Sequence, residues 1–271
     1  MRINTNINAM IATNQMTKNT ALAGNSMEKL STGLRITKAG DDAAGLAVSE
    51  KMRAQIRGME QAERNVQDGI SMVQTAEGAL EEAGNIAQRM RELSIQAGND
   101  TLNTEDRKKI STELQELQKE MTNISEETTF NGNKLLDGKN KNGFKIQAGA
   151  NSEIREVQME NLASIASELG TQIDVSSVSS AQSFTTKVDK ALESINTGRS
   201  KLGAMQNRLE YTSSNLTTST ENLSAAESRI RDVDVAKEMV KLSKLNILNQ
   251  ASQAMVSQAK QQPESVTQLL R

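Results

Sequence analysis

The sequence contains no Cys and no His, so two residue types that much enzyme chemistry requires are missing. Zinc sites built on these residues cannot form, and neither can Ser-His-Asp or Cys-His catalysis. Disulfides are excluded too, so cysteine usage does not indicate the compartment. No Gly-x-x-x-x-Gly-Lys-Ser/Thr loop is present to cradle phosphates. We therefore expect no enzyme activity, no metal and no cofactor.

Large side chains and charge imbalance are also scarce. Aromatic residues make up 1% of the chain, hydrophobic residues 36%, and there is one Pro. Compact cores usually rely on large aromatic residues, so this composition favours long helices with narrow apolar seams. The net charge of −2 gives no whole-chain basis for nucleic-acid binding. No run of 18 apolar residues predicts a membrane span, and the N-terminus lacks the pattern of a cleaved secretory signal.

Two long helices are predicted in the first half. The pattern from about residue 43 to 97 has a period near 3.5 and ends at Gly98-Asn99-Asp100. Asp41 and Asp42 could form a carboxylate pair, but their position before this helix favours capping. A second helix is predicted from about residue 104 to 127, where apolar residues step by four and three in heptad fashion.

The middle of the chain changes character. Asn131-Gly132, Asp137-Gly138 and Asn142-Gly143 are strong turn signals, and we expect a small β-hairpin near residues 143–159. Residues 175–186 are rich in Ser and Thr. We expect them to form a short surface loop or tip.

The last third returns to a helical pattern with a heptad seam. Apolar residues fall at every seventh position: Val188, Ile195, Leu202, Leu209, Leu216, Leu223 and Ile230.

Both ends of the chain contain an uncharged segment, residues 3–17 and 245–259. Such segments could lie on membranes or be disordered, but membrane-surface helices usually carry a basic face. We favour a third interpretation, in which they order by packing against copies of the same chain, because tight assemblies disfavour buried unpaired charge. The predicted polymerisation interface comprises Ile3, Ile7, Met10, Ile11, Leu245, Leu248, Met255, Leu269 and Leu270.

These elements predict a mainly α fold: an elongated antiparallel helical hairpin-bundle with coiled-coil seams and a small β-hairpin, in which the two termini pair.

Several long segments resemble bacterial flagellins. They are LSTGLRITKAGDDAAGLAVSEKMRAQIRG (30–58), DGISMVQTAEGAL (68–80), TTFNGNKLLDG (128–138), LGAMQNRLE (202–210), NLSAAESRIRDVD (222–234) and the closing run to Arg271. The resemblance implies that residues 1–42 and 234–271 form a terminal coiled-coil pair lining the inner tube of a filament. It further implies that residues 43–174 and 187–233 form the surrounding helical core. Many flagellins insert large variable domains where this chain has only residues 175–186, so it resembles a minimal form.

The resemblance implies a structural subunit that polymerises with many copies of itself into the extracellular flagellar filament for swimming. It implies secretion through the flagellar export channel as an unfolded chain. The implied partners are a flagellar export chaperone, the filament cap and hook-associated proteins. A hook-filament junction protein, a relative with similar ends, is the alternative, although the matches at 202–210 and 222–234 favour flagellin.

The family is also recognised by a Toll-like receptor of animal innate immunity. The recognised motif resembles IAQRMREL at residues 86–93. By this resemblance Gln88, Arg89, Leu93 and, on the second helix, Glu113 are the receptor-binding residues.

Overall fold

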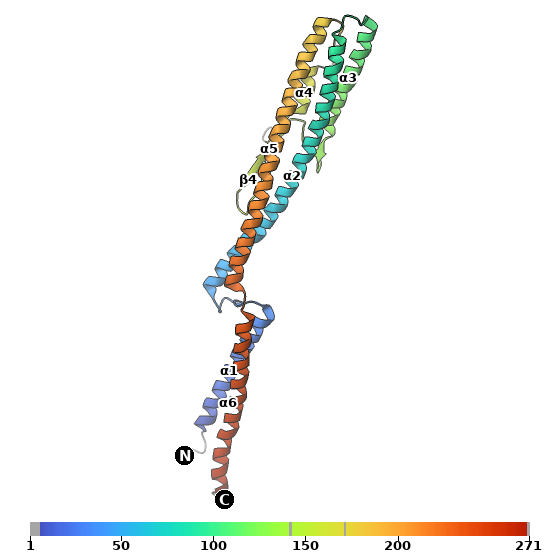
Figure 1. Cartoon of the computed structure of the whole chain (residues 1–271). Helices are drawn as coiled ribbons and strands as arrows, with labels where there is room; N and C mark the ends of the chain where they lie inside the picture. Colours follow the sequence, from blue (N-terminus) through green and yellow to red (C-terminus); the bar gives the residue numbers. More distant parts are fainter. Residues whose placement is uncertain (1–5, 141–142, 171, 270–271) are drawn as a thin grey trace. The chain divides into compact units, whose positions relative to one another are not determined.

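The computed structural model describes residues 6–140, 143–170 and 172–269, with side chains through residue 261. The described residues form six helices, which are α1 (Ile7–Thr32), α2 (Ala43–Ala97), α3 (Thr104–Glu127), α4 (Leu162–Leu169), α5 (Val178–Arg231) and α6 (Val235–Leu269). Four short strands complete the fold: β1 (Thr129–Phe130), β2 (Asn133–Lys134), β3 (Phe144–Gln147) and β4 (Ile154–Val157). They form two antiparallel hairpins, β1-β2 and β3-β4. The mainly α prediction with a small hairpin is confirmed (Figure 1).

The chain divides into two compact units. Unit 1 comprises Met1–Ala54 and Asn222–Arg271, and unit 2 comprises Gln55–Glu221. The division falls inside α2 and α5 rather than at residues 42 and 234, where the sequence analysis placed it. The start of α2 belongs to unit 1 because Glu50 pairs with Arg231 at 2.6 Å and Arg53 lies 3.9 Å from Glu227.

Unit 2 is held together by apolar seams on α2, α3 and α5. The largest fully buried side chains on these helices are Val66, Leu80, Met90, Leu114, Met121, Ile195, Leu202 and Leu209. Burying one such side chain contributes about 1.5–3 kcal/mol. Of the heptad series on α5, the residues from Val188 to Leu216 are buried, whereas Leu223 and Ile230 are half-buried and belong to unit 1.

Close contacts fix the β3-β4 hairpin against α2. A Cβ at Gly69 would clash with Cδ1 of Ile146, and the side-chain amide of Asn65 donates to the Gln147 carbonyl at 3.2 Å. Gly143 begins the hairpin with a φ of 67°, and a Cβ there would lie 2.7 Å from the carbonyl oxygen of Val157. A larger residue at Gly143 therefore meets both a strained backbone and a fixed neighbour.

Two features of the middle differ from the sequence analysis. Residues 178–186 are the first turns of α5 rather than a surface loop, and Val175, Ala181 and Phe184 are buried. Ser and Thr here bond back to the helix, since the Thr185 hydroxyl donates to the Ala181 carbonyl at 2.9 Å. The helix α4 was not predicted, because an eight-residue apolar segment gives a weak periodic signal.

Unit 1 pairs α1 with α6, which lie side by side (Figure 1). The helix α1 ends at Gly33, whose φ of 72° lets the chain turn. Backbone hydrogen bonds then join this turn to the α5–α6 junction: the Arg35 amide donates to the Arg231 carbonyl at 2.6 Å, and the Val233 amide donates to the Gly33 carbonyl at 3.0 Å. Asp42 caps α2 by accepting from the Gly45 amide at 2.9 Å, as predicted.

Within the described residues, no helix is both long enough and apolar enough to cross a membrane.

Candidate assembly surface

The seam between α1 and α6 combines polar and apolar side chains, and its half-buried residues include Ala9, Met16, Leu30, Leu242 and Val256. The buried side chains of these two helices are Asn19, Ser26, Glu238 and Leu245. Leu245 is thus the single large apolar residue buried within the described part of this helix pair. Small and amide side chains let two helix backbones approach closely, and Cα atoms of α1 and α6 come within 8 Å of each other. Most apolar side chains of this seam are only half-buried, so the hydrophobic effect contributes less per residue here than in the core of unit 2.

Hydrogen bonds connect the outer ends of the two helices. Asn6 caps α1, its side-chain oxygen accepting from the Ala9 amide at 3.0 Å. The same side chain donates through Nδ2 to the Ala259 carbonyl of α6 at 2.7 Å. The start of α1 is therefore tied to the last third of α6, which agrees with the predicted pairing of the ends.

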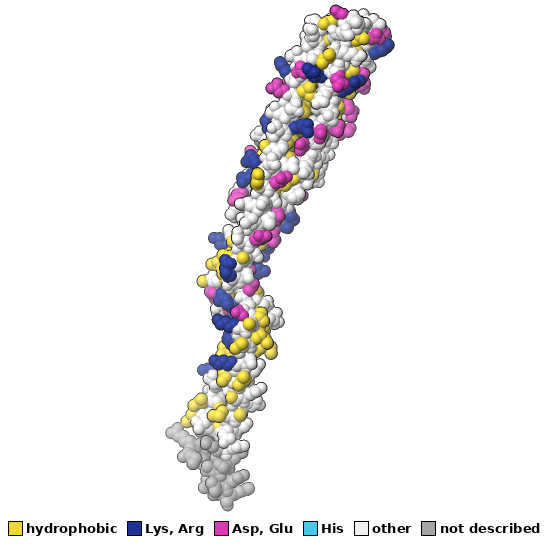
Figure 2. Space-filling model, in the orientation of Figure 1, with side chains coloured by type: hydrophobic (Ala, Val, Ile, Leu, Met, Phe, Trp, Pro, Cys, Tyr) yellow, Lys and Arg dark blue, Asp and Glu magenta, His cyan; other side chains and the backbone are white. Residues whose placement is uncertain are grey.

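The outward surface of α1 and α6 carries many large apolar side chains. Eleven of the fifteen exposed large hydrophobic residues within the described parts of the chain lie on these two helices. They are Ile7, Met10, Ile11, Leu22, Met27, Val235, Met239, Val240, Ile247, Leu248 and Met255. Figure 2 shows hydrophobic side chains gathered over α1 and α6. We call this set the apolar outer face. An accumulation of exposed large apolar side chains is typical of an interaction site.

Most predicted interface residues lie on this face. Ile7, Met10, Ile11, Leu248 and Met255 are exposed, with Ile11 at 60% and Met255 at 64%.

Leu245 is different, because it is 7% exposed and packs into the α1–α6 seam, so the structure does not place it on the surface. Ile3 and Leu270 lie outside the described residues, as does the side chain of Leu269.

The sequence analysis missed part of the face. Val235, Met239 and Val240 at the start of α6 are exposed, as is Ile247. The first three were overlooked because the search used absence of charge as its signal, and this stretch contains Lys237, Glu238 and Lys241. Spacing by four from Val235 to Met239 would have found them.

Two shallow grooves lie on the apolar outer face. One, of about 470 Å³, runs between α1 and α6 and is lined mainly by apolar and amide groups, including Ile11, Leu248 and Met255. The other, of about 360 Å³, lies on α6 between Val240 and Leu248. Across the described residues, no group of three or more acidic side chains could hold a metal ion. The grooves offer surfaces for packing side chains.

One charged group lies within the seam. Glu238 is 9% exposed, and Lys241 lies 3.0 Å from its carboxylate. The pKa of Glu238 is lowered below its ordinary value, first by the Ser26 hydroxyl and then by Lys241. The Ser26 hydroxyl meets no partner at full hydrogen-bond geometry among the described residues, so its contact with Glu238 is weak. The carboxylate therefore stays charged inside the seam, held mainly by groups of unit 1 itself.

The predicted receptor-binding residues lie on α2 and α3 of unit 2. Arg89 bridges the two helices, 3.0 Å from Glu113 and 3.3 Å from Glu92. Gln88, Arg89 and Glu113 are exposed. Leu93 is only 2% exposed because it faces the core of unit 2, so it cannot serve as a surface contact in this conformation.

Comparison with protein families gives two matches that cover most of the chain. Residues 3–141 match the bacterial flagellin N-terminal helical region. Residues 185–270 match the bacterial flagellin C-terminal helical region. Nothing in these matches favours the alternative of a hook-filament junction protein.

Individual relatives agree with the family match. The chain is 53% identical over 274 residues to a flagellin of Halalkalibacterium halodurans and 48% identical over 308 residues to a flagellin of Bacillus subtilis, covering 100% of both sequences in each case. The crystal structure of Bacillus cereus flagellin matches 60% of this chain and 94% of its own, with 32% identity and a TM-score of 0.52. The two helical regions, the paired ends and the full-length relatives agree, and the chain belongs to the bacterial flagellin family of filament subunits.

Proposed function

We propose that the apolar outer face of α1 and α6 is the surface through which copies of this chain pack in the flagellar filament. The observation that supports the proposal is the set of eleven large apolar side chains that α1 and α6 leave exposed. Each large apolar side chain covered by a neighbour contributes about 1.5–3 kcal/mol, less the cost of ordering. Covering several on each copy stabilises the polymer strongly.

The experiment measures polymerisation of the purified chain seeded with short filament fragments. Ile11→Asp and Ile247→Asp each place a charge on the apolar outer face. Since both residues are exposed in the isolated chain, the monomer should keep its circular dichroism spectrum while losing sedimentable filaments.

Tyr211→Asp is the matched control, because Tyr211 is 78% exposed but lies on α5 in unit 2. This variant should polymerise like the unmodified chain. Wild-type filament yield from both Ile11→Asp and Ile247→Asp would rule out the proposed surface.

Secretion and assembly partners follow from the family resemblance. We infer export through the flagellar channel as an unfolded chain, with a chaperone that covers the C-terminal region before export. The exposed apolar residues of α6 support this inference, because such a surface needs covering until neighbours are present. The filament cap and hook-associated proteins would be the partners at the two ends of the polymer. Deleting residues 245–271 should leave a helical monomer that neither polymerises nor binds the chaperone in a pull-down.

Recognition by a Toll-like receptor is supported by the exposed Arg89–Glu113 pair. Arg89→Ala should weaken receptor signalling by the monomer, because it removes a charged contact from the proposed surface. Arg91→Ala is the control, since Arg91 is a similarly exposed arginine of α2 that pairs with Asp189 of α5 instead. Full signalling by the Arg89→Ala monomer in a receptor reporter assay would contradict the inference.

A further inference from the structure

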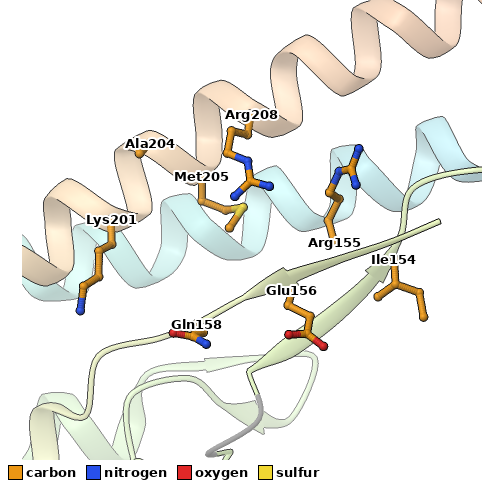
Figure 3. Close-up of a pocket in the computed structure, with 8 residues that line it drawn as sticks. All are labelled: Ile154, Arg155, Glu156, Gln158, Lys201, Ala204, Met205 and Arg208. Atoms are coloured by element: carbon orange, nitrogen blue, oxygen red, sulfur yellow. The ribbon is translucent and has the colours of Figure 1, made fainter.

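A groove of about 620 Å³ lies in unit 2 between the β3-β4 hairpin and α5. Its lining includes Arg155 on β4 and Lys201, Met205 and Arg208 on α5. Figure 3 shows the Arg155 and Arg208 side chains projecting into the space between the strand and the helix. Ile154 at the rim is an exposed apolar residue. The groove therefore combines two guanidinium groups with apolar surface.

The two guanidinium groups lack partners in the described part of the chain, whereas the neighbouring charges are paired. Lys201 lies 3.4 Å from Glu160. Glu156, the carboxylate that lines the groove, lies 3.6 Å from Lys145. Arg155 and Arg208 are thus two like charges that share one groove without a carboxylate between them. Guanidinium groups in such an arrangement are suited to bind carboxylates in bidentate fashion.

An excess of negative charge occurs at the end of α3 in the same unit. Glu126 and Glu127 occupy the last turn of this helix, which contains no basic residue. Carboxylates at a helix C-terminus are unfavourable, because they face the negative end of the helix dipole. Both side chains are exposed, and neither has an ion pair among the residues that the structure describes. Within the described residues of one copy, neither glutamate forms an ion pair with an arginine of the groove.

We propose that Glu126 and Glu127 of one copy bind in the Arg155–Arg208 groove of a second copy in the filament. The proposal rests on the proposed function, because it needs a polymer that brings the two surfaces together. The contact is heterologous, since each copy offers one groove and one acidic pair, and such contacts repeat along an open helical assembly. It neutralises two unfavourable charge clusters at once and covers Ile154 and Met205. Polymerisation would then depend on unit 2 as well as on the apolar outer face.

The test combines charge reversals in full-length chains under seeded polymerisation at low ionic strength. R155E/R208E and E126K/E127K should each slow polymerisation by roughly tenfold or more, because like charges then oppose each other. Both monomers should retain the wild-type circular dichroism spectrum, since the substituted residues have no ion-pair partners within the described chain. Added salt should reduce the defect of each variant.

Rescue distinguishes a direct contact from a general charge effect. The quadruple variant should recover polymerisation, and so should an equimolar mixture of the two double variants, which can alternate along the filament. K187E/K190E is the matched control, because it reverses two exposed lysines of α5 outside the groove with the same change in net charge. It should polymerise at the wild-type rate.

Three outcomes overturn the inference. They are wild-type polymerisation by R155E/R208E, failure of both the quadruple variant and the mixture to recover, and an equal defect in K187E/K190E. Wild-type polymerisation by R155E/R208E would mean that a second copy does not bind in the groove. None of them affects the proposed function, which fails only if Ile11→Asp and Ile247→Asp still form filaments.

Discussion

The two units of this chain differ in how completely they bury their large apolar side chains. In unit 2, leucines, isoleucines and methionines fill the space between helices, and charged residues cover the outside. In unit 1, Asn19, Ser26 and Glu238 lie in the seam, while isoleucines, valines and methionines of α1 and α6 face outward. The comparison teaches that unit 2 obtains its stability within one chain. Unit 1 leaves many of the large apolar side chains of α1 and α6 exposed, which supports the proposed assembly surface.

The largest consequence should appear in hydrogen exchange of the isolated monomer. Core amides of α2 and α5 in unit 2 should exchange only through global opening, whereas amides of α1 and α6 should exchange through local opening at a much lower free-energy cost. The reason is the shortage of buried apolar contacts in the α1–α6 seam. Mass spectrometry measures the amide exchange of both units in the monomer and in the filament. Equal protection of α1 and α5 in the monomer would break the contrast between the units.

A pair of leucine substitutions tests the same contrast energetically. Leu209 of unit 2 is 0% exposed, and Leu209→Ala should cost about 2–5 kcal/mol of unfolding free energy through lost burial and cavity formation. Leu245 is buried in unit 1, and Leu245→Ala should lower the stability of unit 2 by less than about 0.5 kcal/mol. Denaturant unfolding followed by circular dichroism gives both values. An unchanged midpoint for Leu209→Ala would exclude this residue from the core.

Acid should weaken unit 1 through Glu238. Its pKa is lowered in the fold, so the stability that it contributes is present above its unfolded pKa and is lost as pH falls through the folded value. Because the unfolded pKa of Glu is about 4.3, the loss should begin below about pH 5. Glu238→Gln should remove this loss of stability at low pH. Hydrogen exchange of the α1 and α6 amides at several pH values measures it. Glu113→Gln, in an exposed pair of unit 2, provides the comparison.

The smallest effect is expected at the surface of unit 2. Arg89 and Glu113 are both about half exposed, so Arg89→Ala should cost only about 0.2–1 kcal/mol of unfolding free energy. With so small a loss of stability, the Arg89→Ala monomer stays folded in the receptor signalling assay. A loss above about 2 kcal/mol in denaturant unfolding would mean that this residue holds α2 and α3 together.

Much of the architecture followed from periodicity. The bounds of α2 and α3 and the positions of β3 and β4 matched the predictions, because long heptad patterns and Asn-Gly turns are strong local signals. The prediction of a surface loop at residues 175–186 was wrong. Val175, Ala181 and Phe184 are buried by packing that composition does not reveal. The assembly surface was predicted in part. Leu245 and Leu93 are buried rather than exposed. The sequence pattern shows that a helix position is apolar, but it does not show whether the same chain or a partner covers that position.

The sequence by itself determined the long helices, the absence of Cys and His chemistry, and the family. These depend on spacing, on residue inventory and on matched segments, all of which are local or linear properties. Only the tertiary structure decided that Glu238 is buried in the seam of α1 and α6 and that Arg155 and Arg208 share a groove. The burial in the seam and the shared groove both depend on how helices and strands that are distant in sequence pack against one another.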